Sequence, residues 1–421
     1  MTARPEPRGR GSRGQRERTG LRGLLPLLGP AMVAGVAYLD PGNVASNASA
    51  GARYGYLLVW VVVLANTMAW LVQYLSAKLG FSTGESLPGL LGQSLRHRGA
   101  RYAFWVQAEL VAMATDVAEV LGGAIALNLL FHLPLIVGGV ITGVVSLLLL
   151  ALNNRRGSLA FERVVVGLVV IIGVGFCAGI LFAPVDGAAA LGGLVPRFRD
   201  SSSVLLAASI LGATVMPHAI YAHSALTRDR FGRVDDGPER VRVLRATRID
   251  VTVALAVAGT VNVVILLLAA STLPGVDGAG TLPGAYAAIS AALGPVIATL
   301  FAVGLLASGL ASTSVGAYAG AEIMQDLLHA KVPMLVRRLI ALIPALLILI
   351  IGVDPTWALV LSQVVLSFGI PFALIPLVRY TSRRSLLGEA ANRWWTTAIA
   401  VIAAALLIGL NVTLIALLLA G

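Results

Sequence analysis

Residues 35–47 read GVAYLDPGNVASN and place Asp40 directly before a proline and a glycine. The preceding residues, from Leu24, read LLPLLGPAMVAGVAYL, an apolar run typical of a segment that crosses a bilayer. A charge at the centre of such a helix costs on the order of 3 kcal/mol on insertion scales. A proline kink would explain Pro41 but not the charge, so we interpret Asp40 as part of a functional site.

The composition is that of a polytopic membrane protein. Of the 421 residues, 57% are hydrophobic and only 12% are charged, whereas soluble proteins carry about 25% charged residues. The apolar runs are too long for the strands of a membrane barrel, which are about ten residues each. The sequence therefore predicts an all-α membrane protein with eleven spans, at 23–48, 54–79, 102–130, 133–152, 162–183, 203–227, 249–272, 284–314, 335–353, 356–379 and 394–420.

The net charge of +11 has an uneven distribution. If the N-terminus is cytoplasmic and each span reverses the side, all but three of the 31 Lys and Arg residues lie inside; the exceptions are Arg53, Arg197 and Arg199. This is the positive-inside rule rather than a nucleic-acid footprint. We expect a plasma (inner) membrane protein whose partner is the lipid bilayer, with the C-terminus outside the cytoplasm. No nucleic acid and no obligatory protein partner are expected, and residues 1–22, rich in Arg, Gly and Pro, are predicted to be a disordered cytoplasmic tail.

A second interrupted span lies at residues 212–224, GATVMPHAIYAHS. The two interruptions align with each other: Ala37, Asp40 and Pro41 fall on Ala213, Met216 and Pro217. They are five spans apart, so the second unit is inserted upside down relative to the first. Paired broken helices in inverted halves indicate the central binding site of a transporter. The predicted organisation is a 5+5 inverted repeat, with halves at 23–183 and 203–380 and an additional helix at 392–421.

The chemistry at the two breaks favours a cation. Each proline should leave carbonyls about one turn earlier, around Ala37 and Ala213, without helical partners. Unpaired backbone at membrane depth is tolerated only where it lines a cavity, and the first half-helix points the negative end of its dipole at Asp40. The candidate ligands are the Asp40 carboxylate, the Asn43 amide oxygen, the Ala37 and Ala213 carbonyls and the Met216 thioether. Oxygen ligands mixed with a soft sulfur favour divalent transition metals over Mg²⁺ or Ca²⁺.

The motifs Asp40-Pro41-Gly42-Asn43 and Met216-Pro217-His218 resemble the paired signatures of the Nramp family of proton-coupled divalent metal transporters. The resemblance runs from about Leu24 through the last span. One departure is Ala219, where many members have Asn.

This resemblance implies a LeuT-like fold in which helices 1 and 6 are unwound at mid-membrane. It implies import of Mn²⁺ or Fe²⁺, and also Cd²⁺ or Co²⁺, together with H⁺, all as transported substrates with no cofactor. The implied metal ligands are Asp40, Asn43, Met216 and the Ala213 carbonyl, joined in some conformations by the Ala37 carbonyl and, on occlusion, by Gln363 of the tenth span.

Three carboxylates of the third span, Glu109, Asp116 and Glu119, lie within about 80° of one another on a helix. Carboxylates on one face of a membrane span favour an ion or proton route. Arg337 and Arg338, at the start of the ninth span, either pair with them or simply flank the membrane, and Glu109 is either part of the route or an interfacial residue. The resemblance places Asp116, Glu119, Arg337 and Arg338 in the polar network of the proton route.

Three further residues lie near the breaks. His218 could relay protons, because an imidazole titrates near neutral pH. His223, about 140° away on the helix, is expected to face the cytoplasm. Tyr38 either gates the cavity or packs.

Other classes of function fit the sequence less well. There is no H-E-x-x-H motif for an intramembrane metalloenzyme, so we expect no enzymatic activity. An amino-acid transporter binds its substrate carboxylate at a half-helix N-terminus, which an aspartate at the break opposes. The alternative left open is a divalent cation channel or uniporter that is not coupled to protons.

Overall fold

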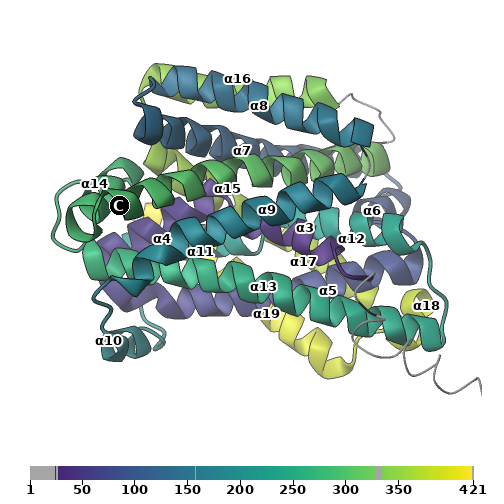
Figure 1. The fold of residues 1–421 in the computed structure, drawn as a ribbon. Coiled ribbons are helices and arrows are strands. Elements are labelled where there is room, and N and C mark those ends of the chain that lie inside the picture. The colour runs from purple at the N-terminus through teal and green to yellow at the C-terminus, as the bar shows by residue number, and fades with distance from the viewer. Residues whose placement is uncertain (1–23, 25–26, 157, 329–333, 420–421) are drawn as a thin grey trace, which may run out of the picture.

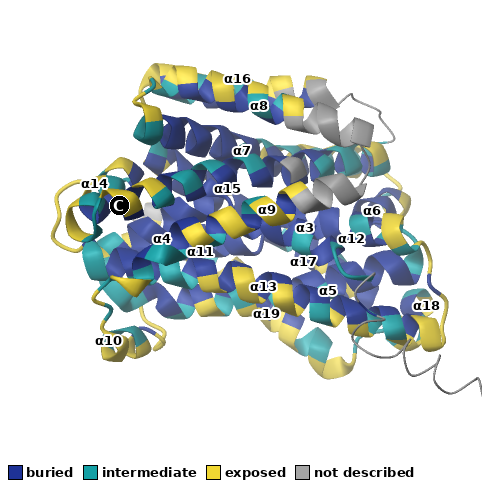
Figure 2. Cartoon of the chain, in the orientation of Figure 1, coloured by how far each residue is buried: buried dark blue, intermediate teal, exposed yellow. Residues whose placement is uncertain are grey.

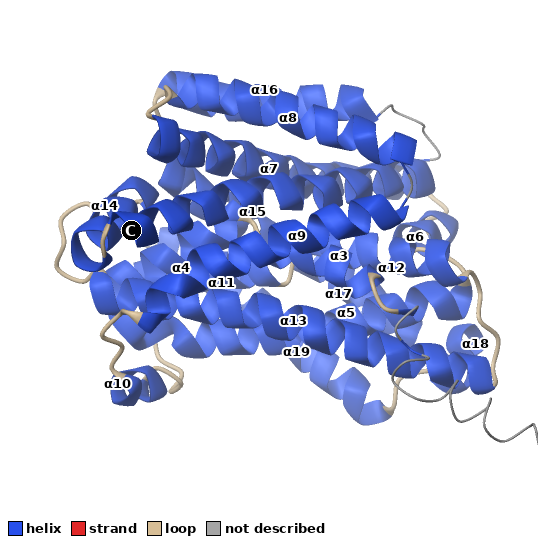
Figure 3. Cartoon of the chain, in the orientation of Figure 1, coloured by secondary structure: helices blue, strands red, loops and turns tan. Residues whose placement is uncertain are grey.

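A computed structural model of the chain describes residue 24 and residues 27–156, 158–328 and 334–419. Every regular element within these residues is a helix (Figure 3), which confirms the predicted all-α class. The predicted tail at 1–22 lies outside the described residues.

The helices have the following bounds: α3 Pro30–Gly35, η2 Val36–Leu39, α4 Pro41–Tyr54, η3 Gly55–Leu58, α5 Val59–Thr83, α6 Leu87–Ser94, α7 Arg98–Phe131, α8 Leu135–Arg156, α9 Ser158–Cys177, η4 Ala178–Leu181, α10 Gly187–Gly192, α11 Ser201–Thr214, α12 Pro217–Phe231, α13 Pro238–Thr272, α14 Leu282–Leu293, α15 Pro295–Glu322, η5 Ile323–Leu327, α16 Met334–Ile351, α17 Pro355–Thr381, α18 Arg384–Leu387, η6 Gly388–Ala390 and α19 Trp394–Leu419.

Each of the eleven predicted spans overlaps one or more helices. Within the described residues, eight helical segments are long and apolar enough to cross a membrane when α4 is joined to α5 and α11 to α12. Shorter apolar helices cover residues 30–39, 135–148 and 339–351, which supply the first half of span 1 and spans 4 and 9.

The predicted span 284–314 is wrong in one respect, because it merges two helices. α14 ends at Leu293, and α15 begins at Pro295. Gly294 between them has φ 94°, a value that favours glycine, and Pro295 occupies the first helical position, where its missing N–H costs no hydrogen bond. The chain therefore turns at 294 before the membrane helix starts.

The two interrupted helices lie at the centre of the bundle (Figure 1). α8 and α16 form an outer layer on one side, next to α7, while α13 and α19 lie towards the opposite side. α4, α11 and α12 are almost wholly buried, whereas α8, α16 and α19 carry many exposed residues (Figure 2). Many of these are large and apolar, as at Ile351 and Leu406. An apolar outer surface around a buried polar centre is the arrangement expected of a protein surrounded by lipid.

Candidate functional site

Two helix interruptions form the core of the site. η2 ends at Leu39, Asp40 is extended at φ −69° and ψ 160°, and α4 begins at Pro41. In the same way α11 ends at Thr214, Met216 is extended at φ −60° and ψ 124°, and α12 begins at Pro217. Each proline is thus the first residue of the second half-helix, the position that proline fits best. The predicted breaks in helices 1 and 6 are confirmed.

Asp40 is completely buried and uses both of its carboxylate oxygens. Oδ1 accepts a hydrogen bond from the backbone N–H of Asn43 at 2.8 Å, which makes Asp40 the N-cap of α4. Oδ2 accepts from Nε2 of Gln363 at 2.9 Å. Asp40 therefore faces the positive end of α4 as well as the negative end of the half-helix before it.

The backbone carbonyls at the breaks are not free, which corrects the sequence-based expectation. The Ala37 carbonyl accepts from the Asp40 N–H at 3.3 Å, and the Ala213 carbonyl accepts from Nδ2 of Asn43 at 3.3 Å. The same Nδ2 donates to the Tyr38 carbonyl at 2.7 Å. Because an unpaired buried carbonyl is costly, a neighbouring amide occupies it.

Side chains of other helices hold the remaining carbonyls of the first break. Nδ2 of Asn262, on α13, donates to the Tyr38 carbonyl at 3.1 Å, and the Ser308 hydroxyl of α15 donates to the Leu39 carbonyl. On α4 itself, Nδ2 of Asn47 donates to Oδ1 of Asn43 at 2.7 Å. Ser308 and Asn47 were assigned no role from the sequence, where their only signal is that they are polar residues within apolar spans.

Gln363 of α17 lies between the two broken helices. A Cβ added at Gly42 would lie 1.7 Å from Gln363 Nε2, and one added at Gly212 would lie 1.9 Å from the Gln363 carbonyl oxygen. Gln363 is fully buried, and its Oε1 has no hydrogen-bond partner among the described residues. The structure thus brings Asp40, Asn43, Gln363 and the Ala213 carbonyl together, and Met216 is fully buried in the second break.

Tyr38 belongs to a buried chain of hydrogen bonds that joins three helices. Its hydroxyl is hydrogen-bonded to Nε2 of Gln73 on α5, and Oε1 of Gln73 is 2.6 Å from Nδ1 of His223 on α12. His223 is only 1% exposed, so its expected position facing the cytoplasm is wrong. The helical angle between His218 and His223 gave their separation but could not show that Gln73 packs against the second imidazole.

The α7 carboxylates and His218 lie on adjoining surfaces. Nδ1 of His218 is 3.3 Å from the hydroxyl of Thr115, the residue before Asp116 on α7. Asp116 and Glu119 are both buried and face α15, since a Cβ added at Gly316 would lie 3.9 Å and 3.1 Å from their carboxylate oxygens. Glu109, Asp116 and Glu119 were predicted to share one side of the helix. The structure shows this for Asp116 and Glu119, which both face Gly316 of α15.

Arg337 extends this polar region along α7. Its Nε is 3.0 Å from Oε1 of Glu109, and only 6% of its side chain is exposed. A Cβ added at Gly320 would lie 2.0 Å from the Arg337 guanidinium, so this glycine makes room for it on α15. The alternative in which Arg337 merely flanks the membrane is therefore excluded, whereas the side chain of Arg338 lies outside the described residues.

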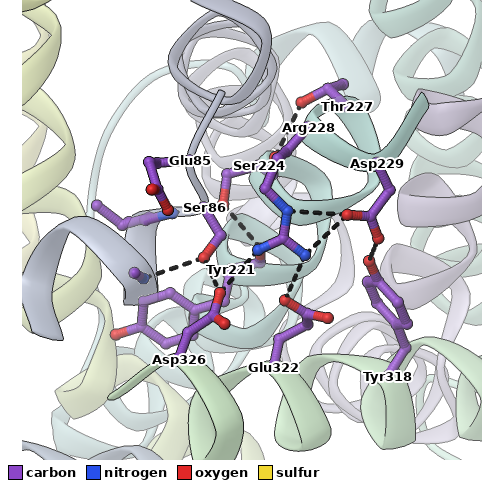
Figure 4. Close-up of polar contacts among 12 residues, drawn as sticks. Glu85, Ser86, Tyr221, Ser224, Thr227, Arg228, Asp229, Tyr318, Glu322 and Asp326 are labelled. Atoms are coloured by element: carbon purple, nitrogen blue, oxygen red, sulfur yellow. Dashed lines mark hydrogen bonds and ion pairs between the residues drawn. The ribbon is translucent and has the colours of Figure 1, made fainter. Parts of the chain in front are cut away.

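A second charged cluster, which the sequence analysis missed, joins the end of α12 to α15 (Figure 4). The Arg228 guanidinium is 2.9 Å from Glu322, 2.8 Å from Asp326 and 2.8 Å from Asp229. Asp326 also accepts from the hydroxyl of Ser86, the N-cap of α6, and the Tyr318 hydroxyl donates to Asp229 at 2.6 Å. We refer to Arg228, Asp229, Glu322 and Asp326 as the Arg228 cluster. The sequence did contain a signal for this cluster: Glu322 and Asp326 follow the eighth predicted span, and Arg228 follows the sixth.

Comparison with known proteins decides the family. The model of the Nramp family, described as natural resistance-associated macrophage protein-like, matches residues 31–417. The chain belongs to the Nramp family. A relative from Mycobacterium tuberculosis H37Rv, named divalent metal cation transporter MntH, is 58% identical over 411 residues, which are 98% of this chain and 96% of the relative. The MntH of Bacillus subtilis 168 is 46% identical over 400 residues, 94% of this chain and 93% of that one. These names confirm a transport protein rather than an enzyme.

Solved structures confirm the LeuT-like fold. The Eremococcus coleocola manganese transporter, in complex with an aromatic bis-isothiourea substituted compound, is 29% identical with a TM-score of 0.82, covering 96% of this chain and 87% of that one. The nucleobase-cation-symport-1 transporter Mhp1, 16% identical with a TM-score of 0.58, shares the fold alone; it covers 93% of this chain and 91% of that one. The chain is a multi-pass membrane protein of this architecture.

Proposed function

We propose that the chain imports divalent transition-metal ions, Mn²⁺ and Fe²⁺ and also Cd²⁺ and Co²⁺, together with protons by alternating access. The observation that carries the proposal is the fully buried Asp40 carboxylate at the point where two broken helices and Gln363 meet. Membership of the Nramp family and relatives named divalent metal cation transporter and manganese transporter support the same function.

The proposed ligands are Asp40, Asn43, Met216 and the Ala213 carbonyl, with the Ala37 carbonyl joining in some conformations. The hydrogen bonds that Asp40 makes in this structure suggest which of its oxygens would bind the metal. Asp40 Oδ2 accepts from the Gln363 side-chain amide, whereas Oδ1 accepts from the Asn43 N–H and caps α4, so Oδ2 is the oxygen that a cation can take with least disturbance of the helix.

Gln363 fits the role of a ligand that completes the site. Its Oε1 is buried next to Asp40 without a hydrogen-bond donor among the described residues, and such an oxygen is costly unless it gains a partner. A bound cation would supply that partner. The Met216 thioether adds a soft ligand where Ca²⁺ or Mg²⁺ would prefer oxygen.

We further propose that protons travel from Asp40 towards α7 rather than with the metal. His218 lies two residues after Met216, and its Nδ1 is 3.3 Å from the hydroxyl of Thr115, the residue before Asp116; this contact supports a role for the imidazole as the relay between Asp40 and the carboxylates of α7. Asp116 and Glu119 would accept the proton next, and the Glu109–Arg337 pair would form the far end of the route. Arg338 is assigned to the same route by family resemblance.

The metal would leave past two closures. Tyr38, Gln73 and His223 connect η2 to α5 and α12, so Tyr38 acts as the gate nearest to Asp40. The Arg228 cluster joins the end of α12 to α15 and α6. In the proposed orientation, with the N-terminus in the cytoplasm of a plasma-membrane protein, both closures lie on the cytoplasmic side.

The test is transport by the full chain in proteoliposomes. We expect Mn²⁺ uptake to rise as the external pH falls, and addition of Mn²⁺ to acidify the vesicle lumen. Asp40→Asn vesicles are the matched control for leak. Saturable Mn²⁺ uptake that neither responds to the proton gradient nor moves protons would replace the symporter with the uniporter or channel alternative. If sealed vesicles that contain the folded protein take up no metal, metal import is rejected.

A further inference from the structure

We propose that the contact between α5 and α13 binds the phosphate headgroup of an anionic phospholipid. The site, which we call the α5–α13 patch, consists of Trp70, Tyr74 and Lys78 of α5 and Arg245, Arg248 and Thr252 of α13. The two helices pack side by side, at the end of the bundle near α18 (Figure 1).

The α5 side of the patch is a row of two aromatic rings and a cation. Trp70, Tyr74 and Lys78 are four residues apart and therefore share one helical face. The Trp70 and Tyr74 rings stack with centroids 5.9 Å apart and planes 9° apart. The ammonium of Lys78 lies 5.8 Å from the Tyr74 centroid.

The α13 side brings a second cation to the same ring. The Arg248 guanidinium carbon is 5.7 Å from the Tyr74 centroid, and the Trp70 indole N–H donates to the Thr252 hydroxyl at 2.9 Å. Arg245, three residues before Arg248, is exposed on the same face of α13. The Tyr74 ring thus contacts two cations, Lys78 and Arg248, and Arg245 lies on the same face of α13.

Among the described residues, the cations of the patch have no negative partner. Lys78 is only 4% exposed, and its contacts are the neutral Asn392 side chain and the Tyr74 ring. No ion pair among the described residues includes Lys78, Arg245 or Arg248. A buried cation without an anion is strongly unfavourable. A phosphate beside Tyr74 would neutralise Lys78 and Arg248 together.

The surroundings of the patch point to a lipid as the source of that phosphate. Trp and Tyr concentrate at the membrane–water interface, where headgroups lie. Beyond Thr252, α13 exposes Ala256, about 40° around the helix from Thr252, and α5 exposes Val63, about 20° from Trp70, so an apolar surface continues from the patch on both helices. A lipid can place its phosphate on the cations and its acyl chains along these apolar side chains. Basic pockets between membrane helices recognise anionic headgroups in this way.

The test measures lipid binding to the full chain in detergent by native mass spectrometry. Dioleoyl phosphatidylglycerol and dioleoyl phosphatidylcholine, which differ in charge but not in chains, are titrated separately. One cation near a membrane surface contributes about fivefold in affinity for an anionic lipid. We expect wild type to prefer phosphatidylglycerol, Arg248→Gln to lose about fivefold, and Arg245→Gln/Arg248→Gln to lose about 25-fold. Both side chains are exposed, so folding is not threatened.

The matched control is Arg383→Gln. Arg383 lies 5.9 Å from the Tyr380 ring and is also exposed, but no second cation of the described residues lies over that ring. We expect this variant to keep the wild-type affinity. The proposal is overturned if both lipids bind equally to wild type, if Arg248→Gln keeps the wild-type affinity, or if Arg383→Gln loses as much. Displacement of phosphatidylglycerol by millimolar inorganic phosphate would identify free phosphate, not lipid, as the ligand.

Discussion

Replacement of Arg228 by glutamine should release the end of α12 from α15. Arg228 is the only cation described in its cluster, and the side chains of Glu322 and Asp326 are only 12% and 15% exposed. Arg228→Gln therefore leaves two carboxylates close together with little water. Removal of one partner of a fully buried ion pair costs about 3–5 kcal/mol. Because Arg228 itself is 20% exposed, we discount this to about 2 kcal/mol.

That energy applies to the arrangement in which α12 contacts α15, and is relieved when the two separate. A change of about 2 kcal/mol shifts such an equilibrium about thirtyfold towards separation. The assay is labelling of a cysteine introduced at Ser224, a buried residue one turn before Arg228, in a Cys177→Ser background that removes the one native thiol. We expect a labelling rate up to thirtyfold higher than with Arg228 intact, and much less change with Arg228→Lys. Equal labelling rates in all three proteins would refute the proposal that the Arg228 cluster holds α12 against α15.

Three further predictions concern the transport route. Asp40→Asn should abolish Mn²⁺ uptake in proteoliposomes, because the amide keeps the shape but not the charge; wild-type uptake would reject the site. Asp116→Asn should leave metal affinity within a few-fold of wild type but weaken metal-driven acidification, and unchanged proton flux would exclude Asp116 from the route. Met216→Ala should keep appreciable Mn²⁺ uptake, lower Cd²⁺ affinity and begin to admit Ca²⁺ or Mg²⁺, since water can replace the thioether. If Ca²⁺ neither competes nor crosses and Cd²⁺ affinity is unaltered, Met216 serves only packing.

The breaks were predictable because they have local causes. Pro41 and Pro217 constrain the chain wherever they occur, and an aspartate in an apolar run indicates function before any contact is known. The partner of Glu109 was foreseen only as one of two alternatives, in which Arg337 either pairs with the carboxylates of the third span or flanks the membrane. These inferences needed only the identity and spacing of residues.

The hydrogen bonds that distant side chains donate to the backbone carbonyls of the site could not be predicted in the same way. The Ala213 carbonyl is paired because Asn43, 170 residues earlier, points its amide at it, and Ser308 reaches the Leu39 carbonyl across 269 residues. The position of His223 depended likewise on Gln73 of another helix. A single sequence gives the face on which a side chain lies but not the helix that packs there.

Asp40 combines two roles that different substitutions can separate. Its Oδ1 caps α4 through the Asn43 N–H, and its Oδ2 is the oxygen we assign to the metal. Asparagine is as good an N-cap as aspartate, whereas alanine costs about 0.5–2 kcal/mol at a cap. Asp40→Asn therefore removes the charge while α4 keeps its start, and Asp40→Ala removes both. If metal binding depends on the charge alone, the two variants lose binding equally and differ only in thermal stability, with alanine the less stable. If the cap also sets the position of Asn43, the Asp40→Ala variant should bind metal more weakly than the Asp40→Asn variant, because the backbone N–H of Asn43 donates the capping hydrogen bond.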